Sequence, residues 1–426
     1  MKRVVILCVW LFSVVAGHAQ LSLDECRRLA RENYPEIRQY DLVHQTEQYN
    51  LSNAARAWIP QFAFSAQATW QTDAPNFPKE LTGMLAQQGL EIPGLRKDQY
   101  KVALELNQTI WDGGKSVADK RIARAEAAEQ KTMTDVDLYE LEGRVDDLYF
   151  GILLLDERIA QTNLTLNLLR SNLEKVRALQ RNGVAMQSDA DVLEAELLSV
   201  GQQLIQFESS CDSYRRMLGI FIGQRVGDRK LQRPSAVQPL SGESARPELA
   251  MFAAKIDRLT AQEKMVKSSS MPRLGFFAQG YYGYPGLDYM QSMMNNDWSW
   301  NAMLGVKLSW NFGAYYTQKN NLNKLRTSRQ QVEVQRDVFL FNMNLQAAQE
   351  NGDIARLRKA IADDDRIVAL RRSVREAAES KLRNGIIDTH DLLSKITDES
   401  TASMARSMRE IELLKAIYEY KHTINR

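Results

Sequence analysis

A short segment of the sequence carries the residue types of a phosphate-binding loop. Gly113-Gly114-Lys115-Ser116 has the order that ends such a loop, in which backbone amides and a lysine hold phosphate oxygens. The loop also requires a glycine five positions before Gly114, where this chain has Thr109. The segment precedes a heptad pattern in a chain that begins with an export signal. We therefore expect a turn before a helix here, and no nucleotide site.

The other groups that could do chemistry are isolated from one another. His44, His390 and His422 are far apart in the sequence, and no His-Glu-x-x-His or paired-cysteine spacing provides metal ligands. No Gly-x-Ser-x-Gly elbow marks a nucleophilic serine. The sequence therefore predicts no catalytic residue, no metal site, no cofactor and no enzymatic activity.

The N-terminus has the pattern of a secretory signal peptide. A basic start at Lys2-Arg3 precedes an apolar run over 4–15, and Gly17-His18-Ala19 is a small-x-small cleavage pattern. The run is shorter than the ~20 apolar residues that a membrane-spanning helix needs. We expect residues 1–19 to be removed and the mature chain to lie outside the cytoplasm.

Charge and cysteine content narrow the possible classes of protein further. The formal net charge is +2, with 55 Lys and Arg residues against 53 Asp and Glu residues mixed along the chain, so no nucleic-acid partner is expected. No cysteine follows the cleavage pattern directly, so a lipid anchor is not indicated. Cys26 and Cys211 fit heptad spacing and are interpreted as small buried residues, while a disulfide between them stays open as an alternative.

Two long stretches are free of proline and have the apolar spacing of coiled coils. No proline occurs between Pro93 and Pro234, or after Pro285. The first stretch predicts a helix over about 115–180, roughly 100 Å long at 1.5 Å per residue, and another over about 186–222. Its three-four rhythm begins with Leu138, Leu141, Val145, Leu148, Ile152, Leu155 and Ile159. Such helices exceed a globular core and indicate side-by-side coiled-coil packing.

The second half of the sequence repeats the order of the first. Arg181-Asn182-Gly183-Val184 returns as Arg383-Asn384-Gly385-Ile386, and Asp189 returns as Asp391, both at a separation of 202 residues. We interpret this as an internal duplication. It divides the mature chain into a first repeat at 20–232, a linker at 233–246 and a second repeat at 247–426. The second repeat predicts helices over about 314–382 and 388–424.

Four segments alternate apolar and polar residues with a period of two, at about 62–71, 100–111, 274–284 and 299–312. Each has about the ten residues that a tilted membrane strand needs, and Trp and Tyr gather near the ends. The connections 72–98 and 285–297 are predicted outer loops. A soluble sheet with one wet face has the same local pattern, and the export signal favours the membrane alternative.

Four strands cannot close a barrel that holds a pore. An open sheet in lipid would leave unpaired backbone groups at both edges, which cost on the order of several kcal/mol each. We therefore expect copies of the chain to complete one barrel around a polar, water-filled lumen, with the long helices gathered into a second tube.

The chain resembles the TolC-like outer-membrane efflux family over essentially all of its mature length. The similarity lies in Leu23-Asp24-Glu25-Cys26 through Asn33-Tyr34-Pro35-Glu36-Ile37, in Ile110-Trp111-Asp112-Gly113-Gly114 with its degenerate counterpart Asn311-Phe312-Gly313-Ala314, and in the duplication. The resemblance implies a mainly α fold with a membrane β part. Three chains would form a twelve-stranded β-barrel in the outer membrane and a long periplasmic α-barrel of antiparallel coiled coils. It also implies a periplasmic adaptor and an inner-membrane transporter as partners.

The residues where paired helices turn are candidate contacts for the adaptor. Gly183 and Gly385 follow long helices and precede new ones, which predicts left-handed helix C-caps. The resemblance implies that these turns form the periplasmic end. The candidate contacts are Arg181, Asn182, Gly183, Val184, Arg383, Asn384, Gly385, Ile386 and Ile387.

Asp391 is the candidate for a pore aperture. It matches an aspartate that the family uses at the narrow periplasmic end, and three copies would attract cations and repel anions. A solvated surface carboxylate is the alternative. The family has a further aspartate three positions on, where this chain has Ser394, and Asp388 is the candidate to replace it. Asp189, at the first-half position, is expected near contacts between subunits.

The resemblance and these observations together predict a passive trimeric exit duct, and the resemblance implies that it serves a tripartite efflux pump or a one-step secretion system, driven by inner-membrane partners. The alternative from another class is a periplasmic coiled-coil scaffold without a pore, which would be extracted without detergent. The sequence does not identify the cargo.

Overall fold

The chain folds into two compact units. The computed structural model describes residues 20–425 except 91, 184, 236–243 and 385. The first unit contains the chain up to Gln39 together with Thr132–Ala250 and Arg336–Arg426, and the second contains Tyr40–Lys131 and Met251–Gln335. The predicted signal peptide and most of the predicted linker lie outside the described residues.

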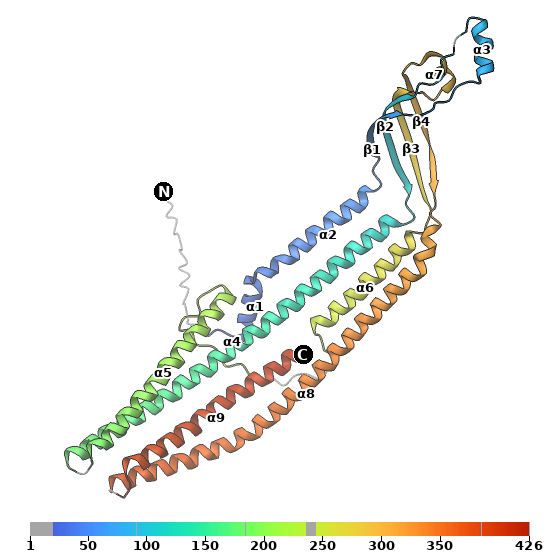
Figure 1. Cartoon of the computed structure of the whole chain (residues 1–426). Helices are drawn as coiled ribbons and strands as arrows, with labels where there is room; N and C mark the ends of the chain where they lie inside the picture. Colours follow the sequence, from blue (N-terminus) through green and yellow to red (C-terminus); the bar gives the residue numbers. More distant parts are fainter. Residues whose placement is uncertain (1–19, 91, 184, 236–243, 385, 426) are drawn as a thin grey trace, which may run out of the picture. The chain divides into compact units, whose positions relative to one another are not determined.

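Long helices make up most of the first unit (Figure 1). They are α4 (Lys115–Arg181), α5 (Gln187–Ile222), α8 (Gly313–Arg383) and α9 (Thr389–Ile424), of which α4 and α8 also contribute their first residues to the second unit. The short α1 (Leu23–Asn33) ends where Pro35 opens a single 3-10 turn, η1 (Pro35–Arg38), because proline cannot continue the helix.

The predicted heptad positions are the core of this unit. Leu138, Leu141, Val145 and Ile152 of α4 are fully buried. Nearer the helix turns, one cluster joins α4, α5, α8 and α9 through Leu166, Leu169, Leu173, Val176, Ala190, Leu193, Val200, Ala378, Leu392 and Ile396. The prediction of long packed helices is therefore confirmed, because the three-four spacing turns one apolar stripe of each helix inwards.

The second unit contains a four-stranded sheet. Helices α2 (Gln39–Arg56) and α6 (Pro247–Ser268) end shortly before Pro60 and Pro272, and a strand follows each proline. The strands are β1 (Gln61–Trp70), β2 (Asp98–Trp111), β3 (Arg273–Tyr284) and β4 (Ser299–Ser309). The prediction of four membrane-length strands is confirmed, and each of the connections 72–98 and 285–297 also holds a short helix that was not predicted: α3 (Lys79–Gln87) and α7 (Tyr289–Asn295).

The sheet is antiparallel in the order β1-β2-β3-β4, and its register separates two faces. Phe64 pairs with Leu104, Leu104 with Gly280, and Gly280 with Ala302, so these positions share one face. On this face the large apolar side chains are exposed: Phe62, Phe64, Trp70, Leu104, Trp300, Leu304, Val306 and Leu308. On the other face Lys101 donates to the side-chain oxygen of Gln279, which donates in turn to Glu105.

The segment that mimics a phosphate loop is the start of α4. The Asp112 carboxylate accepts hydrogen bonds from the backbone N–H groups of Gly114 (2.9 Å) and Ser116 (2.6 Å) and from the Ser116 hydroxyl. Gly113 has a φ of +71°, and a Cβ on it would lie 2.7 Å from Cβ of Met271. The expected turn is confirmed: the aspartate caps the helix, and the glycine permits the left-handed step before it.

Cys26 and Cys211 are both buried and both free. The interpretation as small buried residues is confirmed, and the disulfide alternative is wrong: the Cys211 thiol instead donates to the Asp156 carboxylate of α4 at 3.3 Å. None of the described helices contains a stretch long and apolar enough to cross a membrane.

His422 is an ionisable group held among the helices of the first unit. Its ring stacks on Tyr139 with centroids 4.1 Å apart and an interplanar angle of 5°. Burial, together with the nearby charges of Arg246 and Arg27, lowers the His422 pKa from 6.5 to about 4. The folded state therefore holds the imidazole neutral.

We expect this histidine to make the fold acid-sensitive. A folded-state pKa below the unfolded value means that stability is complete above about pH 6.5 and is lost as the pH falls towards 4, by roughly 2–3 kcal/mol. His422→Phe keeps the stacking and should remove this part of the pH dependence in thermal unfolding scans. The exposed His44→Phe is the matched control, and equal pH profiles for His422→Phe and wild type would contradict the assignment.

Candidate functional site

The turn between α4 and α5 holds the first group of candidate residues. Gly183 has a φ of +74°, the left-handed conformation expected of it, and its N–H donates to the Gln180 carbonyl at 2.9 Å. Arg181 and Asn182 beside it are exposed. Val184 lies outside the described residues. The turn thus presents a cationic and an amide side chain to the surroundings.

The turn between α8 and α9 holds the second group. Arg383 and Asn384 are exposed, and the Asn384 side chain donates to the Ser380 carbonyl at 3.0 Å. Ile386 is 68% exposed, whereas Ile387 packs against the cluster that joins the four helices. Gly385 lies outside the described residues. Of the two isoleucines, only Ile386 is presented for a contact.

The candidate aspartates lie at the starts of α5 and α9. The Asp388 carboxylate accepts a hydrogen bond from the Asp391 N–H at 2.8 Å, and both residues are exposed. Asp189 reaches back and accepts from the Met186 N–H at 2.8 Å. Because helix N-termini carry unpaired N–H groups and a partial positive charge, these carboxylates stabilise the helix starts. Asp391 and Asp388 lie together, and their charge is available to solvent.

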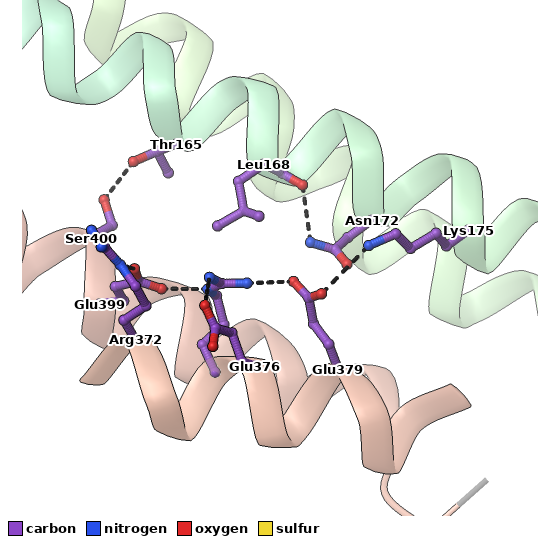
Figure 2. A network of polar contacts seen from close by, with 10 residues as sticks. Thr165, Leu168, Asn172, Lys175, Arg372, Glu376, Glu379, Glu399 and Ser400 are labelled. Carbon is purple, nitrogen blue, oxygen red and sulfur yellow. Dashed lines mark hydrogen bonds and ion pairs between the residues drawn. The ribbon is translucent and has the colours of Figure 1, made fainter. Parts of the chain in front are cut away.

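Farther from the turns, a polar network joins α4, α8 and α9, and Figure 2 shows Lys175, Glu379 and Glu399 among its members. Its centre is Arg375 of α8, whose guanidinium donates to Glu399 of α9 and, at 2.7 Å, to Glu379 of α8. Glu379 also lies 3.5 Å from the Lys175 ammonium of α4. Glu399 accepts a further bond from Arg372 at 3.2 Å. The network therefore connects one helix pair to the other.

Arg375 and Glu399 are largely shielded from water, with 13% and 11% of their side chains exposed. Burial lowers the pKa of Arg375, but the hydrogen bonds and charges of Glu399 and Glu379 raise it by more, and the net pKa lies above its usual value. The arginine is held charged. A shielded ion pair of this kind is costly to break from one side, because the remaining charge stays without compensation.

More ion pairs continue along the contact between α8 and α9. Arg371 of α8 lies 2.8 Å from Asp398, and Asp365 of α8 lies 2.8 Å from Arg406. Arg409 of α9 pairs with the buried Asp364. These ion pairs lie beside a hydrophobic cluster of the same two helices, made by Ile354, Leu357, Ala416 and Ile417.

Sequence reasoning missed two features of this region. Met186, at the first turn, is 74% exposed and adds an apolar contact that a single methionine in a polar stretch does not reveal. The network around Arg375 was missed because its members come from three helices, although the run of arginines on α8 was a signal. In the part of the chain that the structure describes, no three His, Cys, Asp or Glu residues gather as metal ligands.

Comparisons with known proteins agree with this architecture. Residues 27–223 match the family model described as outer membrane efflux protein. No curated protein matches the sequence.

Solved structures similar to the chain include outer-membrane channels. The outer-membrane channel OprN shares 14% identity, with 94% of this chain and 89% of that chain covered at a TM-score of 0.70. VceC from Vibrio cholerae shares 14% identity over 94% of this chain and 95% of that chain, with a TM-score of 0.67. CmeC from Campylobacter jejuni shares 14% identity over 94% and 85%, with a TM-score of 0.65. At this identity the likeness shows the fold.

Proposed function

We propose that the chain is one subunit of a passive exit duct in a Gram-negative outer membrane, because residues 27–223 match the outer membrane efflux protein family model. The resemblance to TolC-like channels drawn from the sequence is confirmed by the family match and by the fold. The duct catalyses no reaction, and inner-membrane partners supply the energy. The scaffold alternative is not favoured.

The exposed apolar face of the sheet carries this proposal. Phe64 is 73% exposed, Trp300 82% and Leu304 75%, and all three belong to one face of the sheet. A face of this kind is unfavourable in water, at about 25 cal/mol per Å² of apolar surface, and favourable against lipid. Aromatic rings gather at one end of the sheet. The ring centroid of Trp298 lies 5.6 Å from that of Tyr100 and 5.3 Å from that of Tyr282. Such rings fit the headgroup region of a membrane.

The opposite face fits a water-filled lumen. Lys101, Gln279 and Glu105 form a hydrogen-bonded row across β2 and β3, and Lys101 also lies 4.6 Å from the ring centre of Tyr281. Since β1 and β4 are edge strands, further chains must pair with them in lipid. Three chains would give twelve strands, and the helices would surround the periplasmic part of the duct.

The helix turns are the proposed periplasmic end. Ile386, Met186, Arg181 and Arg383 are exposed there and are suited to an adaptor that offers apolar and acidic groups. Asp388 and Asp391 would form the aperture, with three copies of each carboxylate around the axis. Asp189 would lie near the contact between subunits. The two repeats of the sequence then correspond to two helix pairs in each subunit.

Conductance in a planar bilayer tests the duct and its aperture. The double variant Asp388→Asn/Asp391→Asn keeps the capping oxygen, because asparagine caps helices about as well as aspartate, and removes the charge. Wild type should form cation-selective channels, and the variant should lose most of that selectivity at similar conductance. Glu208→Gln, exposed on α5 away from the turn, should leave the selectivity unchanged.

The outcomes separate the two parts of the proposal. A protein that stays in solution without detergent and forms no channel would overturn the duct and favour the scaffold. Channels whose selectivity survives the double variant would leave the duct standing and remove the aspartates from the aperture.

A further inference from the structure

The polar face of the sheet has a hollow near the end where β2 leads into α4. The strand register places Thr109 opposite Gly275, and Gly275 opposite Lys307, on the same face as Glu105 and Gln279. Because Gly275 has no side chain, this row of residues has a gap between Thr109 and Lys307. A hollow of about 570 Å³ lies here, with all three residues in its lining. We call it the Gly275 hollow.

Two cationic side chains line the Gly275 hollow without an acidic partner. Arg273 of β3 pairs in register with Ser309 of β4, and Lys307 lies two residues before Ser309, so the two cations are diagonal neighbours on one face. Long side chains in such positions reach one another. Both cations are exposed, and neither forms an ion pair or a side-chain hydrogen bond with another residue that the structure describes. Their like charges repel, and an anion between them would remove the repulsion.

The carboxylates in the lining of the hollow already have partners. Asp112 accepts hydrogen bonds from the backbone N–H groups of Gly114 and Ser116, as the cap of α4. Asp119 lies 2.8 Å from the Lys115 ammonium. Neither carboxylate is therefore free to neutralise the two cations, and the hollow keeps an excess of positive charge.

An aromatic ring lies beside these cations on the polar face. Phe277 stands two residues after Gly275 on β3 and belongs to the lining of the hollow. A Cβ on Gly305 of β4 would lie only 3.0 Å from the Phe277 ring, so the ring lies across the backbone at this glycine. The hollow thus combines free positive charge with an apolar surface, which fits a ligand that has an anionic group and an aromatic body.

We propose that the Gly275 hollow binds an aromatic carboxylate, with the carboxylate between Arg273 and Lys307 and the ring against Phe277. Guanidinium and ammonium groups form strong hydrogen bonds with carboxylates, and the volume is within the range of about 300–1,000 Å³ that is typical of ligand sites. The inference rests on the proposed duct and gives its wall a site for organic anions. In that duct the barrel also opens to the outside, so a ligand reaches the hollow without passing the proposed acidic aperture.

Equilibrium dialysis of benzoate against the purified full chain in detergent tests the site. Benzoate has both a ring and a carboxylate, whereas benzyl alcohol lacks the charge and acetate lacks the ring. Dialysis against protein-free micelles measures uptake by the detergent alone. Benzoate should bind the protein at least about tenfold more tightly than either of the other two probes, because each of them lacks one of the two contacts.

Two variants remove the features on which the site depends. Arg273→Gln/Lys307→Gln keeps polar side chains but removes both charges, and it should weaken benzoate binding at least about tenfold. Gly275→Val fills the gap without changing the charge and should weaken binding by a similar factor. Its Cβ would lie 3.3 Å from the backbone oxygen of Gln108, so the strand must yield by only a few tenths of an ångström, and valine favours strands.

Lys79→Gln is the matched control for the loss of a cation. Lys79 is exposed on α3, at the other end of the sheet from the start of α4 (Figure 1). This variant should bind benzoate as wild type does. Each variant is compared as the detergent-stable assembly isolated by gel filtration, so that a misfolded protein is recognised before its binding is measured.

Conductance in a planar bilayer provides a second measurement. Benzoate added on the outer side should cause brief reductions in the current through wild-type channels, because an occupied hollow narrows the duct. At the same benzoate concentration, Arg273→Gln/Lys307→Gln should show at least about tenfold fewer of these reductions, in parallel with its weaker binding.

The possible results distinguish the site from the function on which it rests. Benzoate binding that survives both the double variant and Gly275→Val would overturn the site, and conducting channels from the same protein would leave the duct intact. Acetate binding as tight as that of benzoate would overturn the contact with Phe277. A protein that binds benzoate through Arg273 and Lys307 but forms no channel would overturn the duct and support the site.

Discussion

Arg375→Met should open the proposed duct, and its single-channel conductance should rise severalfold above that of wild type. The substitution keeps the apolar stem of the side chain but leaves Glu399 and Glu379 facing one another with less compensation. Removal of one member of a shielded ion pair commonly costs about 3–5 kcal/mol. Because Glu379 also meets Lys175 of α4, the loss would loosen the helix pair α8 and α9 from its neighbour.

The measurement is the conductance of purified trimers in a planar bilayer, together with the entry of a large antibiotic into cells. Arg366→Met, an exposed arginine on the same helix, is the matched control and should behave as wild type. If Arg375→Met gave intact trimers with wild-type conductance, the network would stabilise the helices without keeping the duct closed.

Arg27→Met is expected to destabilise the helical unit strongly. Arg27 of α1 donates to Asp146 of α4 at 2.7 Å and through a second bond, and 18% and 11% of the two side chains are exposed. Without the arginine, the buried carboxylate has lost its main partner, which should cost about 3–5 kcal/mol. For a unit of this size, the melting temperature should fall by roughly 10 °C.

The pH dependence identifies the cause. Burial raises the pKa of Asp146 above its usual value, against the lowering effect of Arg27, so the variant should have a still higher pKa. A raised folded-state pKa means that the carboxylate weakens the fold as the pH rises above 3.8. The gap in melting temperature between variant and wild type should therefore be larger at pH 7 than at pH 4.5.

A double variant and a matched control variant test this cause further. Arg27→Met/Asp146→Leu removes both charges and should recover most of the loss. Arg28→Met, on the exposed side of α1 where Arg28 pairs with Glu32, should change stability by less than about 0.5 kcal/mol. A gap that does not depend on pH, or a double variant as unstable as Arg27→Met, would show that lost packing is the cause.

Much of the fold could be predicted from the spacing of apolar residues along the sequence. The three-four spacing through Leu138, Leu141 and Val145 predicted buried helix stripes, and the two-residue alternation around Phe64 and Leu304 predicted strands with one apolar face. Pro60 and Pro272 directly precede β1 and β3 in the structure. These signals are local, because each depends on the geometry of a single helix or strand.

The sequence indicated only part of the role of the helix-capping residues. Asp112 and Gly113 were noted as part of a family motif, and the structure gave their role as helix cap and left-handed turn. Asp388 was considered for its charge alone, although its carboxylate also accepts the Asp391 N–H. Sequence spacing suggests such bonds, but backbone conformation decides which carboxylate makes them.

The contacts between distant helices were decided by the tertiary structure alone. The sequence predicted the paired long helices and the four membrane-length strands, and it contains residues that recur at a separation of 202. It did not determine that Arg375 meets Glu399, that Arg27 meets Asp146, or that Thr165 meets Ser400. Heptad spacing selects the face of a helix that is buried, and many partners satisfy it. The register between two helices is fixed only when all their side chains pack and pair together.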